Sequence, residues 1–329
     1  MLLNRQNVDF LFTQLGADFT LGMNTVQAQM LLPKLATTIK SDTKKEFHSW
    51  MKQIPQMREW IGDRQEANLD VDALTITNRK FESTIEIERE DFEDARDFVA
   101  FSGFSNVSRT MGADATLTQD RILIDTLLGA ATVGKWSDSD YYCSASRKFG
   151  ANTIGNYVTT AYDAAGSALT AAYSTITSYI GHNGKPLFVR PRYILHGPSL
   201  RVKVQQSLSA YGALLAANAS TYVGGQISNP NANLVEPIET PWLVNNYVDM
   251  TGTTWTNAGT YWYILSEIVG GMRGLIYQDR IAPELQNARL DLANSDYVFK
   301  TDKIQFGARM RGAGFIAMPQ CVYMSAATT

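Results

Sequence analysis

Cysteine is scarce in this chain: only Cys143 and Cys321 occur among its 329 residues. They lie far apart and neither belongs to a CxxC pair, so the sequence predicts no disulfide framework and no zinc site. The chain also lacks an apolar run close to the ~18 residues of a membrane span. Its N-terminus lacks the apolar core and cleavage site of a secretory signal. We therefore expect a protein that is made and kept in the cytoplasm, or in a particle assembled there, without membrane contact.

Charge is sparse as well, and the balance between the two signs is nearly even. Charged residues make up 19% of the chain and the formal net charge is −3, which argues against a protein that grips nucleic acid by neutralising phosphates. Small, amide and aromatic residues are abundant instead. Chains that bury surface against neighbours often have this composition, because interfaces deplete charge and favour aromatic residues. A stable β-rich monomer has a similar composition, so composition alone leaves both possibilities open.

Recognisable catalytic motifs are missing from the sequence. GxSxG, P-loop and HExxH patterns are absent, and the histidines are scattered at His48, His182 and His196. His196 follows a predicted strand and has Ser199 nearby, a combination that could support hydrolysis. A polar residue at a strand end more often has a structural role, so we predict no catalytic residue and no cofactor. A soluble hydrolytic enzyme that uses the His196 region is the alternative from a different class.

Acidic residues offer two candidate metal sites. Residues 90–94 carry a cluster of carboxylates, and Asp138 and Asp140 resemble part of a calcium loop. The second pattern lacks the glycine and the distal glutamate that such a loop needs. Consecutive acidic residues at the start of a helix are explained by the favourable N-terminal dipole. The sequence therefore predicts no metal site.

The chain is organised around residues 81–132. From Phe81 to Arg89 alternate residues form one mostly apolar and one mostly acidic face, which predicts a strand with one buried face. A stretch without proline follows from Phe98 to Ala131, and its apolar residues recur at helical spacing. This stretch predicts a helix longer than the globular average. Gly112 is expected to be a mild weakness in it, costing about 1 kcal/mol relative to alanine.

Helices and strands are both predicted in the rest of the chain. The full length of 329 residues suits about two domains. The N-terminal helix is expected to stop at Gly16, and a weak strand at 69–76 is expected to form a hairpin-like excursion with residues 81–89. A second helix is predicted at 163–180 and a long loop at 211–235. Further strands are expected at 187–195, 234–238, 242–248, 260–265, 284–292, 297–310 and 320–325. The predicted class is α+β.

Two segments carry a resemblance to a known family. REWIGDR (58–64) and ITNRKFESTIEIEREDFEDA (76–95) resemble the Mu-like phage major head subunit family, which pairs a tryptophan-glycine motif with a strand of this pattern. The order of the elements also resembles the wider Hong Kong 97-type capsid fold. The closing segment DKIQFGARMRGAGFIAMPQCVYM (302–324) is similar to the end of that fold, a strand with alternating basic residues, a turn and a last strand.

The resemblance implies a division of the chain into the parts of that α+β capsid fold. These parts are an N-terminal arm at 1–46, an extended loop at 47–80, a peripheral domain with a strand and a long spine helix at 81–157, an axial domain at 158–277, and the closing strands of the peripheral domain at 278–329.

The resemblance also implies a function. It is that of the major capsid protein of a tailed bacteriophage or prophage, a structural protein and not an enzyme, which assembles into an icosahedral shell around double-stranded DNA. The expected partners are further copies of the chain in hexamers and pentamers, a portal, a separate scaffolding protein and decoration proteins. DNA is expected to be enclosed without sequence-specific binding. The expected location is the virion, with assembly in the host cytoplasm. An encapsulin-like nanocompartment shell protein and a tail or decoration protein are further alternatives.

Several residues are predicted to lie at contacts between subunits. Aromatic and basic residues are interleaved in 47–64, and acidic residues nearly cancel the basic charge there, which favours a subunit contact over a nucleic-acid contact. The acidic segment before the long helix and the basic residues of the closing strand are further candidates. The predicted contact residues are Trp50, Trp60, Arg64, Asp91, Asp94, Arg309 and Arg311.

Overall fold

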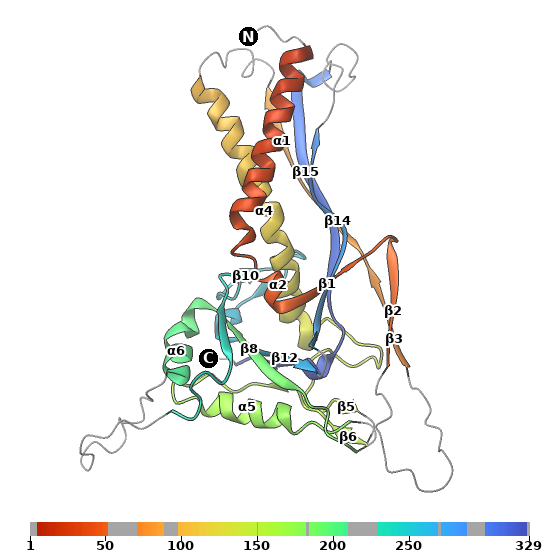
Figure 1. The fold of residues 1–329 in the computed structure, drawn as a ribbon, viewed down its shortest axis with the longest axis vertical. Helices are drawn as coiled ribbons and strands as arrows, with labels where there is room; N and C mark the ends of the chain where they lie inside the picture. The colour runs from red at the N-terminus through yellow and green to blue at the C-terminus, as the bar shows by residue number, and fades with distance from the viewer. Residues whose placement is uncertain are drawn as a thin grey trace, which may run out of the picture.

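The fold is described from a computed structural model, which places residues 5–51, 71–88, 98–149, 151–181, 184–209, 229–268, 271–287 and 300–327. Figure 1 shows an elongated upper part, where long helices lie beside long strands, and a broader lower part with shorter elements. A thin hairpin projects from the side of the molecule. Helices and strands are mixed throughout, so the predicted α+β class is confirmed.

The long central helix is present as predicted. It is α4 (Phe98–Leu128), and a short 3-10 turn (Gly129–Ala131) follows it. Its second half is buried deeply, and Leu123, Ile124, Leu127 and Leu128 have no measurable exposure. The lower half of the helix therefore lies in the core between the two parts of the molecule, where apolar burial stabilises it.

The upper sheet has the strand order β1-β14-β15-β4 among the described residues. Its strands are β1 (Ala36–Lys40), β14 (Leu275–Asn287), β15 (Lys303–Ile316) and β4 (Arg79–Glu88). The strand predicted from Phe81 is confirmed, but β14 begins earlier and β15 ends later than predicted. Position 314 inside β15 is a glycine because the strand passes close to α4 there. A Cβ added at Gly314 would lie 3.0 Å from Thr126 Oγ1 of that helix.

The lower sheet has the order β7-β16-β12-β8-β9, with β13 pairing to β12. Its strands are β7 (Tyr157–Val158), β8 (Arg190–His196), β9 (Glu236–Glu239), β12 (Trp262–Ile268), β13 (Met272–Arg273) and β16 (Val322–Ser325). Trp262 and Ile264 of β12 face the cluster that contains α5 (Ser167–Thr177) and α6 (Arg201–Leu208), while Tyr263 and Leu265 face the cluster of α4. The period of two thus buries both faces of this strand.

The first helix is longer than predicted. It is α1 (Arg5–Gln27), and it continues through Gly16. It lies beside α4 in the same direction, because Leu15 contacts Ser108 and Phe19 contacts Gly112. The Ser108 hydroxyl donates to the Leu15 carbonyl at 2.7 Å. Packing along α4 stabilises the helix more than one glycine destabilises it, so the predicted end at Gly16 is wrong.

The projecting hairpin consists of β2 (Lys45–Met51) and β3 (Val71–Thr77), which pair in antiparallel register. The predicted pairing of the 69–76 strand with residues 81–89 is therefore wrong. Asn78, whose side chain is buried, separates β3 from β4. The strand before it pairs with β2, and β4 after it pairs with β15. The sequence shows alternation in both strands but does not show which strands pair.

Short elements complete the described chain. The segment predicted as a strand at 242–248 is mostly a loop, and the predicted loop at 211–235 lies largely outside the described residues. Among the helices that the structure describes, none has both the length and the apolar character that crossing a membrane requires. The remaining elements are α2 (Leu32–Leu35), β5 (Lys148–Phe149), β6 (Asn152–Thr153), β10 (Tyr247–Val248), β11 (Thr254–Trp255) and three short 3-10 turns at Pro198–Leu200, Ala258–Thr260 and Pro319–Cys321.

Candidate functional site

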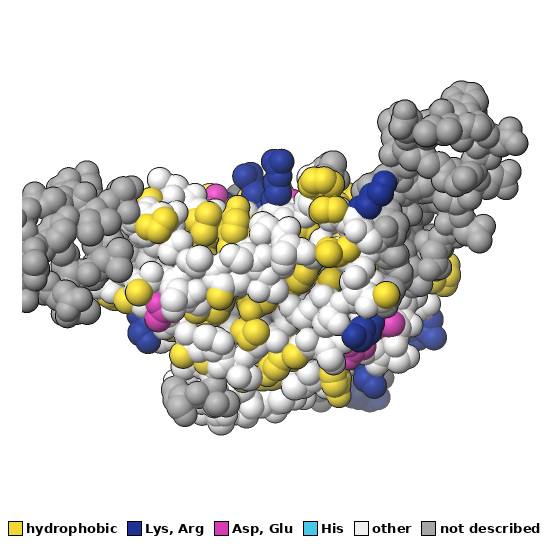
Figure 2. Space-filling view, turned by 90° about the horizontal axis from the view of Figure 1, so that it is seen from below, with side chains coloured by type: hydrophobic (Ala, Val, Ile, Leu, Met, Phe, Trp, Pro, Cys, Tyr) yellow, Lys and Arg dark blue, Asp and Glu magenta, His cyan; other side chains and the backbone are white. Residues whose placement is uncertain are grey.

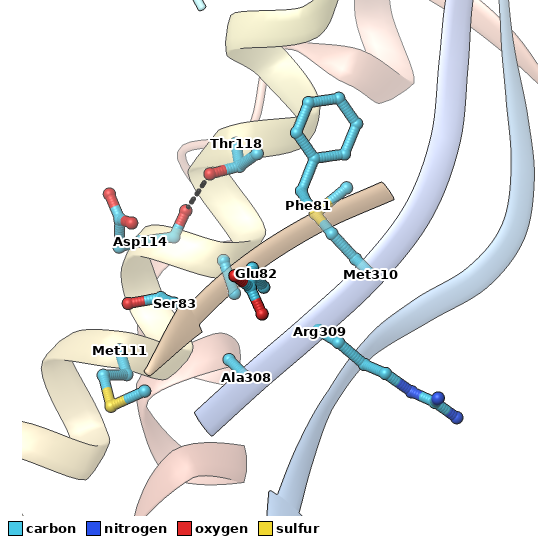
Figure 3. A pocket seen from close by; sticks show the side chains of 10 residues that line it. Phe81, Glu82, Ser83, Met111, Asp114, Thr118, Ala308, Arg309 and Met310 are labelled. Carbon is cyan, nitrogen blue, oxygen red and sulfur yellow. Dashed lines mark hydrogen bonds between the residues drawn. The ribbon is translucent and has the colours of Figure 1, made fainter. Parts of the chain in front are cut away.

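The upper sheet has two chemically different faces. Figure 3 shows Phe81 and Met310 close to one another near α4, while Arg309 extends away from the helix. On that outer face, Arg309 lies in register between Glu82 of β4 and Glu284 of β14. Its Nε donates to Glu284 Oε1 at 2.5 Å, and both side chains are about half exposed. Exposed pairs of this kind contribute little stability, so the charges mainly define the character of the surface.

The same pattern of charge continues along the outer face. Lys303 Nζ lies 3.7 Å from Glu86 Oε2, whereas Lys80 lies directly opposite another cation, Arg311. A groove of about 660 Å³ runs over this face and is lined by Lys80, Arg309 and Arg311, with Thr84 among the polar residues between them. The outer face is therefore an exposed polar surface with a hollow large enough for a peptide side chain or a short segment.

The inner face of the sheet holds a much smaller gap. Figure 3 shows this pocket between α4 and the β4 and β15 strands, where Met111, Ser83 and Asp114 also line it. Its volume of about 40 Å³ is close to that of one water molecule, so it is a packing gap and not a ligand site. A wider groove of about 430 Å³ opens beside it at the edge of β4, against Val107.

A buried polar network holds the base of the projecting hairpin. His48 of β2 forms a hydrogen bond at 2.8 Å between its Nε2 and Oε1 of Gln278 in β14, a side chain with no exposure. Gln278 Nε2 donates to Asn78 Oδ1 at 2.7 Å, and Asn78 Nδ2 donates to Ser41 Oγ at 2.7 Å. Buried polar groups that satisfy one another fix a single geometry, so this network sets the direction in which the hairpin leaves the sheet.

The turn before β2 is closed by one carboxylate. Glu46 Oε1 accepts from the backbone N–H of Thr43 at 2.9 Å, from the Asp42 N–H at 3.0 Å and from Ser41 Oγ at 2.9 Å. The Thr43 N–H is the main cause that lowers the pKa of Glu46 to about 2. Glu46 is therefore ionised across the physiological pH range, and its charge keeps the turn closed.

Helix α4 also anchors the loop that contains β10. Asp125 accepts from the Tyr247 hydroxyl at 2.7 Å and from the Met250 N–H at 3.0 Å. Arg121 Nε donates to the same hydroxyl at 3.0 Å, and its guanidinium lies 5.6 Å from the Trp242 ring centre. Burial raises the pKa of Asp125. This anchor was not predicted from the sequence, although Arg121 and Asp125 stand at the i, i+4 spacing of neighbours on one helix face.

The lower end of the molecule is poor in charge. Seen from below in Figure 2, its centre consists mainly of uncharged and apolar side chains, and the charged ones lie toward the edges. Helix α5 runs along this end in Figure 1, and its sequence SALTAAYSTIT contains no charged residue. Charge depletion of this kind is typical of surface that meets another protein.

The predicted contact residues are only partly described. Arg309 and Arg311 lie two residues apart on the outer face of β15, where Arg309 is exposed and Arg311 half-buried. The backbone of Trp50 lies in β2, opposite Asp72 of β3. Trp60, Arg64, Asp91 and Asp94 lie outside the described residues. The structure therefore brings together the two arginines, and their role between subunits stays a prediction.

The residues weighed for hydrolysis do not contact each other through a hydrogen bond. His196 is buried, its Nδ1 donates to the Gly197 carbonyl at 2.9 Å, and burial lowers its pKa. Ser199 Oγ donates to a different carbonyl, that of Gly259. Each side chain is thus occupied with the backbone, as in a structural role.

The residues weighed for metal binding have other partners or are not described. Asp138 Oδ2 accepts from Arg147 Nη1 at 2.6 Å, and Arg147 is 1% exposed. Within the described ranges, no group of three or more His, Cys, Asp or Glu side chains could hold a metal ion. The acidic cluster at 90–94 lies outside those ranges.

The two cysteines are buried as free thiols. Burial raises the pKa of Cys143 and of Cys321 to about 12. A thiol with so high a pKa is protonated at neutral pH, and since the thiolate is the reactive form, both cysteines are packing residues.

Comparison with known sequences finds a family match over both ends of the chain and two curated relatives. The family described as Mu-like prophage major head subunit gpT matches residues 8–168 and 245–329. The major capsid protein of Escherichia phage Mu is 24% identical over 142 residues, which span 43% of this chain and 45% of that protein. The Mu-like prophage FluMu major head subunit of Haemophilus influenzae is 29% identical over 151 residues, 45% of this chain and 46% of that protein. The matched stretches thus span less than half of each relative.

Comparison of structures covers nearly the whole chain. A chain in the procapsid of bacteriophage JBD30 matches with a TM-score of 0.53 and 18% identity, over 99% of this chain and 77% of that one. At this identity the likeness shows a common fold. The predicted Hong Kong 97-type capsid fold is therefore confirmed.

Proposed function

The chain belongs to the Mu-like prophage major head subunit gpT family, and from that premise we propose that it is the major capsid protein of a tailed bacteriophage or prophage. The observation that carries the proposal is the family match, because it includes α4, β4, β14 and β15, the elements of the elongated upper body. In this role the protein is structural and not an enzyme. It forms an icosahedral shell around double-stranded DNA, within the virion, after assembly in the host cytoplasm.

The mechanism is repeated contact between unlike surfaces of identical subunits. Contacts of this kind generate rings when the rotation from each subunit to the next adds up to a full turn. Rings of five and six subunits then tile a closed shell. Each contact can be weak, because every subunit makes several and the linked contacts reinforce one another. Portal, scaffolding and decoration proteins are the further partners that we propose, and the small net charge of −3 suits a shell that encloses DNA without gripping it.

We assign the parts of the capsid fold as follows, and the arrangement of the elements supports the assignment. Residues 1–46 are the arm, 47–80 the extended loop, 81–157 and 278–329 the peripheral domain, and 158–277 the axial domain. The β2–β3 hairpin projects from the body in Figure 1, as a loop that reaches a neighbour must. The lower end, whose centre is poor in charge, belongs mostly to the axial domain, which is where we propose ring contacts.

The residues that we propose at subunit contacts belong to two of these parts. The extended loop contributes aromatic and basic residues, and the peripheral domain contributes charged residues at the acidic segment and on the outer face of β15. They are Trp50, Trp60, Arg64, Asp91, Asp94, Arg309 and Arg311. The exposed position of Arg309 supports the assignment.

Shortening the extended loop is expected to block closed shells without unfolding the subunit. The change replaces residues 54–68 with a short Gly-Ser linker and keeps β2 and β3 intact. Because the hairpin base is held by its own buried network, we expect the far-ultraviolet circular dichroism and the melting temperature to stay close to those of the unaltered chain. Sedimentation velocity should show large assemblies for the unaltered chain and small oligomers for the variant.

Two outcomes of that experiment would contradict the proposal at different points. Assemblies of normal size from the shortened variant would show that residues 54–68 are not the reaching loop. Sedimentation of the unaltered chain as a stable 36.5 kDa monomer would contradict the shell function itself.

A further inference from the structure

One position on the outer face of the upper sheet places two like charges together. In the antiparallel register of β4 and β15, Lys80 lies directly opposite Arg311. Like charges in directly opposite positions destabilise a sheet. Two residues earlier on β15, Arg309 lies between two carboxylates, those of Glu82 and Glu284, so opposite charges are paired in that row of the sheet. The Lys80–Arg311 row thus departs from the charge pairing of its neighbour.

The third member of that row supplies no counter-charge. Arg311 pairs on its other side with Ile281 of β14, and within the described residues neither Lys80 nor Arg311 has an ion pair. Arg311 Nε is buried, and no acceptor among the described residues forms a hydrogen bond with it. A buried donor without an acceptor is unfavourable, and an ionised one more so. Both cations also line the outer groove of about 660 Å³, together with Arg309 and with Glu82, which lies opposite Arg309 in the next row. The end of the groove at Lys80 and Arg311 is therefore cationic, and the described residues supply no carboxylate to either side chain.

The chain contains a segment with the complementary charge. Residues 88–97, EREDFEDARD, have six acidic and two basic residues, a net charge of 2 − 6 = −4. Carboxylates match a guanidinium well, because both are planar and two parallel N–H···O bonds can form. Charge complementarity of this strength selects partners and sets the register between them.

The geometry of the chain points to a segment from another copy. Glu88 pairs with Lys303, eight residues along β15 from Arg311, a distance of roughly 26 Å at about 3.3 Å per residue. The acidic segment ends where α4 begins, at Phe98. Phe98 lies thirteen residues before Met111, which is roughly 20 Å along the helix, and Met111 lies beside β4. The nine intervening residues span at most about 32 Å, too short to reach Arg311 and come back.

We propose that Lys80 and Arg311 form a carboxylate-binding seat that receives the acidic segment 88–97 of a neighbouring copy in the shell. The inference rests on the proposed shell function and names a specific contact within it. The seat and the acidic segment lie at different points of the same peripheral domain. Each subunit therefore binds the acidic segment of one neighbour at its seat and places its own acidic segment in the seat of another neighbour. Such a contact is heterologous and can repeat around a ring of subunits.

Charge reversal at the seat tests the contact. In Arg311→Glu the new carboxylate lies opposite Lys80, which removes the like-charge row, so the isolated subunit should melt no lower than the unaltered one. The yield of particles in sedimentation should fall about tenfold or more, because a charge-assisted contact is replaced by repulsion. Asp91→Lys with Asp94→Lys should lower the yield similarly. Combining the three changes should restore particles, since the signs are exchanged on both sides.

Arg311→Lys is the matched control and should keep the particle yield near that of the unaltered chain. Normal yield from Arg311→Glu would overturn the seat. Failure of the combined variant to recover, when both separate variants lose particles, would overturn segment 88–97 as the occupant. Absence of particles from the unaltered chain would overturn the shell function and, with it, this inference.

Discussion

Replacing Gly22 or Gly112 with alanine is expected to destabilise the chain, although alanine is the better helix former. The two glycines lie where α1 and α4 approach most closely. A Cβ at Gly22 would lie 1.9 Å from the Arg109 carbonyl oxygen, and one at Gly112 would lie 2.1 Å from that of Phe19. Both atoms are backbone, so the helices must separate. Overpacking of this kind costs roughly 1–3 kcal/mol, more than the ~1 kcal/mol that alanine gains in helix propensity.

Two other glycines in the same helices provide matched controls. Gly16 in α1 and Gly103 in α4 have no atom within 4 Å of an added Cβ. Alanine at either position should therefore stabilise the chain by about 0.5–1 kcal/mol. Urea unfolding followed by circular dichroism measures all four variants. If the alanine variants at Gly22 and Gly112 are as stable as those at Gly16 and Gly103, the close approach of the helices is wrong.

Replacing Asn156 with alanine is expected to have an effect at least as large. Asn156 has no exposure, and its Nδ2 donates to the carbonyls of Tyr142, Pro319 and Val322 at 3.0, 2.9 and 3.0 Å. Its Oδ1 accepts from the Ser144 N–H at 2.8 Å. The side chain therefore joins the loop after α4 to the last strand. Alanine leaves several buried backbone groups without partners, at a cost of about 1–3 kcal/mol each, so we expect a loss of roughly 3–5 kcal/mol.

Asn152 is the control for that variant, because its half-buried side chain makes one hydrogen bond, to the Gly181 carbonyl at 2.8 Å. Asn152→Ala should cost less than about 1 kcal/mol. Thermal unfolding of the two variants distinguishes them clearly. Equal melting temperatures for Asn152→Ala and Asn156→Ala would show that the buried network of Asn156 does not hold the two segments together.

The strongest sequence patterns predicted the elements with the clearest local causes. Helix α4 has apolar residues at helical spacing along much of its length, and β4 has one mostly apolar and one mostly acidic face, so both were predicted closely. The extent of α1 was not predicted, because packing on α4 overrides Gly16. The partner of β3 was not predicted either, since pairing depends on contacts distant in sequence. Gly112 illustrates the same limit: its propensity is visible in the sequence, but its contact with Phe19 is not.

The charged outer face of the upper sheet was predicted only in part, because its local pattern is visible in the sequence and its strand pairing is not. Alternating residues in the closing strand placed Arg309 and Arg311 on one face, and the structure confirms that placement. Lys80 was missed because only the register of β4 with β15 brings it opposite Arg311. The anchors on α4 were missed because Arg121 and Asp125 form an ordinary helical pair until the β10 loop packs on them.

Electron microscopy of the purified chain, expressed alone, tests the shell function most directly. We expect closed shells or rings of five and six subunits, and a reconstruction should show the paired helices α1 and α4 beside the long strands in every subunit. A homogeneous preparation of compact monomers, with no rings or shells at any protein concentration, would contradict it.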